Sequence, residues 1–98
     1  MAHLVEILLP VSDAPMQQAL EDIRNELTAR FGGATLHTNA PAEGAWADNG
    51  TLELDRVVIA EVMTEGLDRD WWRHYRERLE RQLAQDEIVI RATQIDRL

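Results

Sequence analysis

The first part of the chain changes from a strand-like to a helix-like pattern of apolar residues. A short apolar run over residues 4–9, interrupted only by Glu6, predicts a β-strand. Apolar residues then recur at helical spacing over residues 16–31, which is typical of a helix that buries one face. Capping and turn residues at 12–15 predict the start of this helix, and Gly32 predicts its end.

The remainder of the chain repeats these patterns in the order strand, strand, helix, strand. Residues 34–38 predict a second strand, and residues 52–63 predict a third strand that is apolar on both faces toward its end. Asp68 is placed to cap a second helix, whose apolar stripe extends to Leu83. Residues 88–95 predict the last strand.

The segment between the second and third predicted strands has no clear periodicity. Residues 39–50 contain Gly44 and the turn signal Asp48-Asn49-Gly50, so we expect a long hairpin connection or a flap. Trp46 is the large apolar residue of this segment. We interpret it either as a lid over a pocket or as a residue that fills the end of the core or reaches a second subunit.

The order of the elements predicts an α+β architecture. It is that of a ferredoxin-like βαββαβ fold, in which a four-stranded antiparallel sheet carries both helices on one face and the strands lie in the spatial order fourth, first, third, second. Strand alternation predicts the helix-facing residues to be Val5, Ile7, Leu9, Val58, Ala60, Val62, Ile88 and Ile90. It predicts the apolar residues of the open face to be Leu4, Leu8, Val57, Ile59, Met63 and Val89. A monomer rarely exposes so large an apolar patch, so we expect a homodimer.

Length and composition limit the number of domains and exclude several kinds of chemistry and partner. A chain of 98 residues predicts one domain over 1–98, and the lack of cysteine excludes disulfides, thiolate nucleophiles and cysteine-based metal centres. The net charge of −8, from 18 acidic residues and 10 arginines, disfavours nucleic acid and anionic membranes as partners. No apolar run approaches the ~20 residues of a membrane span, and no signal-peptide pattern begins the chain, so we expect a cytoplasmic protein.

One polar row interrupts the predicted open face. In the expected strand order, Arg91, Glu6, Glu61 and His37 follow one another across the sheet. Neighbouring carboxylates in an apolar pocket can prepare a general acid or base, whereas a structural ion pair of Glu6 with Arg91 explains the same residues without catalysis. Under the functional interpretation, the candidate catalytic residues are Glu61, Glu6 and His37, and the candidate ligand-binding residues are Arg91, Trp46 and Met63.

The residues do not support metal binding, RNA binding or phosphatase activity. The three histidines, His3, His37 and His74, do not have metal-ligand spacing, so no metal site is expected. RNA-binding domains of this topology stack bases on aromatic residues of the central strands, and residues 57–63 contain none. Residues 10–15 lack the Gly- and Arg-rich phosphate cradle that a phosphatase of this fold needs.

Two segments carry a resemblance to a known family. The run Leu-Thr-Ala-Arg-Phe-Gly-Gly-Ala-Thr over 27–35, followed by Gly-Ala-Trp at 44–46 and Arg-Ala at 91–92, resembles a family of small uncharacterised bacterial proteins. The resemblance implies a ferredoxin-like fold of the dimeric α+β barrel type. It implies no catalytic residue, because the family has no established activity.

These observations favour a homodimer that encloses a largely apolar pocket between its sheets. We expect such a pocket to bind or transform a small organic molecule without a tightly held cofactor. The alternative is a non-catalytic module whose open face or Trp46 segment binds a partner protein.

Overall fold

The structure is a computed structural model that describes residues 1–10, 16–38, 42–48 and 50–98. Its elements are β1 (Ala2–Pro10), α1 (Met16–Phe31), β2 (Thr35–Leu36), β3 (Ala42–Asp48), β4 (Thr51–Glu65), α2 (Arg69–Gln82) and β5 (Val89–Ile95). The expected helix-start residues 12–15 lie outside the described residues. Neither helix is long and apolar enough to cross a membrane.

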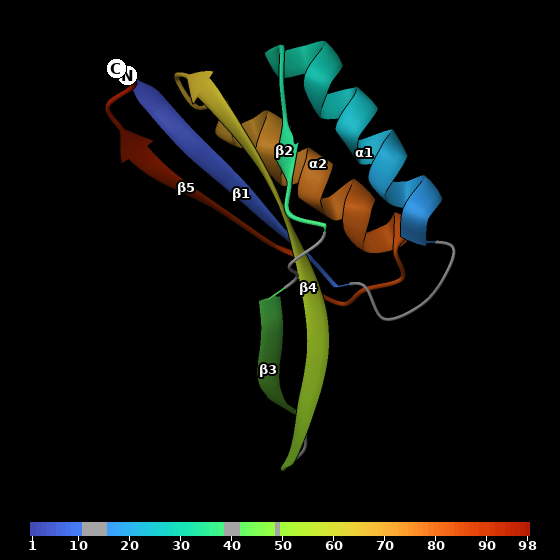
Figure 1. The fold of residues 1–98 in the computed structure, drawn as a ribbon. Coiled ribbons are helices and arrows are strands. Elements are labelled where there is room, and N and C mark those ends of the chain that lie inside the picture. Colours follow the sequence, from blue (N-terminus) through green and yellow to red (C-terminus); the bar gives the residue numbers. More distant parts are fainter. Residues whose placement is uncertain (11–15, 39–41, 49) are drawn as a thin grey trace.

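The strands form one antiparallel sheet in the order β2-β4-β1-β5, and β3 pairs with the first part of β4. Because β4 and β5 are the third and fourth of the predicted strands, the predicted spatial order is confirmed. Both helices cover one face of this sheet, and the two chain termini lie next to each other (Figure 1). The ferredoxin-like α+β fold expected from the element order is therefore present.

The hydrophobic core lies between the sheet and the two helices. Of the predicted helix-facing residues, all but half-buried Ile90 are buried, which confirms the predicted alternation of the strands. The helices contribute the buried residues Ile23 and Leu27 from α1, and Trp72, Tyr75 and Leu79 from α2. This interlayer contact fixes which face of the sheet remains open.

An aromatic cluster joins the ends of the two helices. The Phe31 ring stacks on Trp72 with a centroid separation of 5.1 Å, and Trp71 stacks on Tyr75 at 4.9 Å. Gly32 ends α1 with a φ of +85°, and its N–H donates to the Thr28 carbonyl over 2.8 Å. A left-handed residue is easiest for glycine, so the Gly32 stop expected from the sequence is confirmed.

Helix α2 is anchored at both ends by carboxylates. Asp68 accepts a hydrogen bond from the Trp71 N–H over 3.1 Å, which confirms the predicted N-cap. Near the other end, the Glu80 carboxylate accepts from the Ile88 N–H over 2.8 Å. This bond connects the last turns of α2 to the residue directly before β5 (Val89–Ile95).

The segment expected to be a loop or flap is instead a strand. β3 pairs in register with β4 from Ala42 opposite Val57 to Asp48 opposite Thr51. Together they form an arm that extends beyond the helices (Figure 1). Alanine, glycine and aspartate have low strand propensity, and the pairing with β4 overrides it. The expectation of a long hairpin connection or a flap over 39–50 was therefore wrong for Ala42–Asp48, and residues 39–41 and 49 of that segment lie outside the described residues.

The open face also differs from expectation at one residue. Val57, expected to be exposed there, is buried with 4 % of its surface accessible. It lies where β4 passes from the body into the arm, opposite both Pro10 and Ala42. Strands on both sides therefore cover a residue that alternation alone assigns to solvent or a second subunit.

Candidate functional site on the open sheet face

The polar row predicted from alternation exists in the structure. Glu6 on β1 is the register partner of Glu61 on β4 and of Arg91 on β5. The Arg91 Nε donates to the Glu6 carboxylate over 3.1 Å. At the other end, the His37 Nε2 lies 3.2 Å from the Glu61 Oε1. Four strand segments that are distant in sequence thus bring the four residues into one line.

His37 reaches the row because β2 is continued by one more pairing. The His37 N–H donates to the Ile59 carbonyl over 2.9 Å, just beyond the Leu36–Ala60 pair. This bond holds the backbone of His37 beside β4, and its ring then meets Glu61. A carboxylate at this distance orients an imidazole, which is the arrangement that proton-transfer dyads use.

The row consists of two contacts side by side, the Arg91–Glu6 ion pair and the His37–Glu61 contact. The carboxylates are the less exposed members, with 19 % of the Glu6 side chain and 26 % of the Glu61 side chain accessible. Arg91 and His37 are about half exposed and flank them from the outer strands. Each carboxylate therefore has a basic partner, which offsets its desolvation and the repulsion between the two neighbours.

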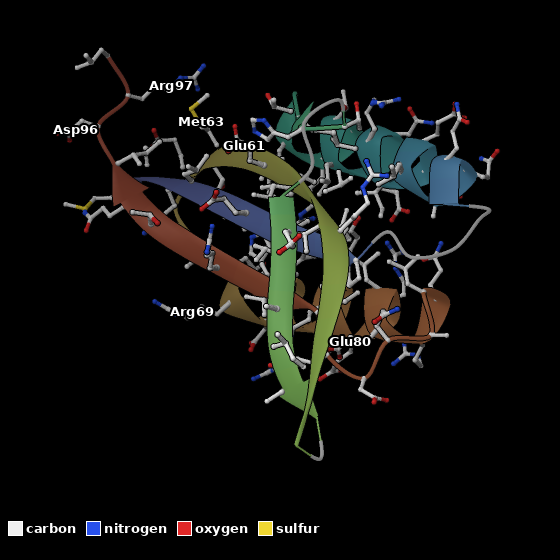
Figure 2. The ribbon with its side chains drawn as sticks, turned by 60° about the horizontal axis from the view of Figure 1, so that its bottom comes forward. Glu61, Met63, Arg69, Glu80, Asp96 and Arg97 are labelled. Carbon is white, nitrogen blue, oxygen red and sulfur yellow. The ribbon has the colours of Figure 1, made fainter. Side chains whose placement is uncertain are left out.

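A hollow of about 390 Å³ adjoins this row at the Glu61 end. Glu61, Met63 and Arg97 line it and lie at the same end of the molecule in Figure 2. The hollow exists because β2 is only two residues long and pairs with β4 no further than Thr35 opposite Glu61. Beyond that point β4 keeps β1 on one side, and Gly32 and neighbouring loop residues border the other.

Two lining residues of this hollow were not identified from the sequence. Arg97 follows the last strand and belongs to no periodic pattern. It arrives here because Ala2 pairs with both Ile95 and Glu65, so that the C-terminal residues leave the sheet beside the end of β4. Thr35 borders the hollow from the first position of β2. No local signal in the sequence identifies Arg97, because its place in the hollow follows from the strand pairing.

Trp46 is not brought to the row within this chain. Its backbone lies in β3 opposite Glu53, about 26 Å of extended strand before Glu61 on β4. The position of its side chain lies outside the described part of the structure. Met63, in contrast, borders the hollow directly, with 48 % of its surface accessible.

Among the described residues, no group of three or more His, Asp or Glu side chains is arranged to hold a metal ion. The row can instead perform two operations on an organic molecule. The guanidinium groups of Arg91 in the row and of Arg97 in the hollow can each bind an anionic group, because arginine offers several donors in a fixed plane. The His37–Glu61 pair can accept or donate a proton.

The fold and the site together define the class of the protein as a small ferredoxin-like α+β protein with an open, partly charged sheet face. No protein-family model matches the sequence, and no curated protein matches it significantly.

Several solved structures share the fold. The divalent cation tolerance protein CutA from Archaeoglobus fulgidus, described as periplasmic, superposes with a TM-score of 0.67 at 16% identity, over 99% of this chain and 86% of that chain. CutA from Synechococcus elongatus gives a TM-score of 0.63 at 6% identity, over 96% and 76%. A phage SAM lyase in its apo state gives 0.55 at 16% identity, over 94% and 78%. Identities this low establish a common fold and nothing about activity.

Proposed function

We propose that this protein binds a small organic anion on the open sheet face and transfers a proton on it, without a tightly held cofactor. One observation carries the proposal. Glu61, whose carboxylate lies 3.2 Å from His37, lines a hollow that Arg97 also lines, so that an anion-binding group lies in the same space as one member of the His37–Glu61 pair. In this assignment His37 exchanges the proton, Glu61 orients His37, and Arg97 holds the anionic group.

Self-association completes the site in this proposal. Met63 and Val89 expose 48 % and 45 % of their surfaces on the open face, and Leu4, Leu8 and Ile59 are half-buried there. A second copy placed face to face would bury this apolar surface and close the hollow against water. Exclusion of water strengthens every charge interaction inside, which favours a homodimer as the active form.

The comparisons agree with small-molecule chemistry on this fold. The phage protein is described as a lyase that acts on SAM, so the fold accommodates an organic substrate in at least that protein. The CutA protein from Archaeoglobus fulgidus is described by divalent cation tolerance, and that description is not carried over to this chain. A cytoplasmic location stays a prediction, and cell fractionation tests it.

A second candidate function is a non-catalytic association module, and the arm favours it. Among the described elements, β3 makes its substantial contacts with β4 alone. Leu52 exposes 65 % of its surface there, on the same face as exposed Ala45 and Ala47. A two-stranded hairpin is marginally stable by itself, so a partner surface that covers these residues would stabilise the arm.

The leading proposal is tested by NMR with small oxo acids that carry an exchangeable C–H, such as pyruvate and 2-oxobutanoate. We expect the backbone signals of Thr35 and Met63 to shift on titration, and the protein to accelerate exchange of that C–H in deuterated water. His37→Gln abolishes the acceleration but leaves the signal shifts, because His37 moves the proton. Arg97→Gln weakens binding by about tenfold, the loss expected for one charge-assisted contact.

Matched controls are available on the same elements. Glu65→Gln changes a carboxylate on β4 outside the row, and Arg24→Gln changes an arginine on α1, so both should leave binding and exchange unaltered. If none of the acids shifts these signals, or exchange is the same in His37→Gln, the enzyme proposal is wrong. Loss of self-association in Leu52→Ser, together with that negative result, would favour the association module.

A further inference from the structure

A second hollow lies on the other side of the sheet, between α2 and the outer strand β5. Its volume is about 410 Å³, within the range of small-molecule sites. It exists because β5 forms the edge of the sheet and α2 covers it only partly, so that Ala92 and Gln94 of β5 remain exposed. Of the candidate residues of the open face, Arg91 also lines this space, whereas His37, Glu61 and Arg97 do not.

The hollow is basic, although the chain is acidic. Arg69, Arg73 and Arg76 line it from one face of α2, because residues four and three positions apart share a helix face. His3 lines it from β1, and Arg91, which pairs with Glu6 on the open face, lines it from β5. No carboxylate side chain is among the lining residues that the structure describes, in a chain with 18 acidic residues and 10 arginines.

The three arginines of α2 that line the hollow differ in whether a carboxylate already pairs with them. Arg73 donates to Asp70 over 2.7 Å, and the Arg76 guanidinium lies 3.7 Å from Glu80. Arg69 forms no ion pair with any side chain in the described ranges. A guanidinium has five N–H donors, so even the paired arginines keep donors for a further anion.

Helix stability does not explain Arg69. It is the first residue of α2, directly after the N-cap Asp68, where the helix dipole disfavours a positive charge. In Figure 2 its side chain extends on the β5 side of the molecule, which agrees with its place in the wall of the hollow. An unpaired arginine at the unfavourable end of a helix is instead suited to bind an anion.

The remainder of the wall is apolar. Trp72, Val5 and Leu67 line the hollow together with Ile90, and the first two are buried. We propose that this hollow binds a small organic anion, a carboxylate or a phosphate ester, whose charged group contacts Arg69 and Arg73 and whose flat apolar body lies against Trp72 and Ile90. The proposal is independent of the function assigned to the open face.

The experiment uses three probes that share one apolar body: 2-naphthyl phosphate, 2-naphthoate and the neutral 2-naphthamide. Binding is measured by calorimetry and located by the backbone amide signals of Leu67, Ile90 and Ala92. We expect one or both anions to bind there and the amide to bind at least about tenfold more weakly, because it lacks the charged contacts. Comparison of 2-naphthyl phosphate with 2-naphthoate shows whether the hollow prefers a phosphate ester or a carboxylate.

Variants then test the arginines. Arg69→Gln and Arg73→Gln each weaken anion binding by about tenfold, the loss of one charge-assisted contact, while Arg81→Gln on the outer part of α2 does not. Arg69 has no described ion pair to lose, so that variant stays informative even if Arg73→Gln unfolds. Equal binding of 2-naphthamide, equal losses in Arg69→Gln and Arg81→Gln, or no binding of either anion would overturn the proposal.

Discussion

The Tyr75 hydroxyl gives the sharpest test of the core. Tyr75 is 4 % exposed, and its hydroxyl is buried without a hydrogen-bond partner among the described residues. A buried polar group without a partner destabilises the native state by about 1–3 kcal/mol, because it loses its bond to water. Tyr75→Phe removes this group alone.

The ring contacts survive the substitution. Tyr75 stacks on Trp71 at 4.9 Å, meets Trp72 edge-on at 5.9 Å, and lies below the Arg78 guanidinium at 4.9 Å. A phenyl ring can keep all three contacts. We therefore expect Tyr75→Phe to raise the free energy of unfolding by about 1 kcal/mol, and the melting temperature by roughly 4–8 °C for a domain of this size.

The same residue predicts a dependence on alkaline pH. Burial raises the pKa of Tyr75 from 10.0 to about 12, because a tyrosinate is poorly solvated in the core. The unfolded chain therefore releases this proton first as pH rises. Stability from Tyr75 is intact below pH 10 and is lost between about 10 and 12, by roughly 2–3 kcal/mol in total. The Phe variant lacks this loss.

Urea unfolding of both proteins between pH 7 and 12 measures the effect, and absorbance at 295 nm follows the sole tyrosine of the chain. The difference between the two proteins isolates Tyr75 from the effects of alkaline pH that both proteins share. A Phe variant that is less stable than the wild type at pH 7 would show that the hydroxyl has a partner. Equal alkaline slopes would contradict the raised pKa.

Three further predictions concern assembly, core and capping. Light scattering at micromolar concentration gives a mass of about twice 11.2 kDa for the wild type, and a monomeric wild type would refute the face-to-face dimer. Ile59→Asp yields monomer or aggregate, whereas Gln17→Asp, on the helix side, keeps the mass of the wild type. Ile23→Ala destabilises by about 2–5 kcal/mol, because the residue is fully buried, and Arg81→Ala by less than about 0.5, measured by urea unfolding. Asp68→Ala destabilises by about 1 kcal/mol through the lost N-cap, and Asp70→Ala, which removes a surface pair, by less; the reverse order would contradict the assigned cap.

The residues of the polar row show how much alternation could predict. Glu6, Glu61 and Arg91 interrupt apolar strands at positions that point away from the helices, and an antiparallel sheet of known strand order then aligns them. His37 joined the prediction on the same grounds. Local pattern was sufficient because strand side chains have a strict period of two, and one buried face specifies the register.

The position of Arg97 could not be predicted from the local pattern. Nothing local to Arg97 indicates the hollow beside Glu61, which results from the pairing of Ala2 with Ile95 and from the shortness of β2. The basic hollow also depends on how far α2 covers β5.

The sequence by itself therefore determined the order of the elements, the residues of the core and the alignment of the polar row, because helix and strand periods repeat over neighbouring residues. The tertiary structure alone decided the strand state of Ala42–Asp48, the burial of Val57 and the two hollows. Those features depend on where strands end and on how far layers overlap. Such lengths are set by contacts between residues distant in sequence, which no local period encodes.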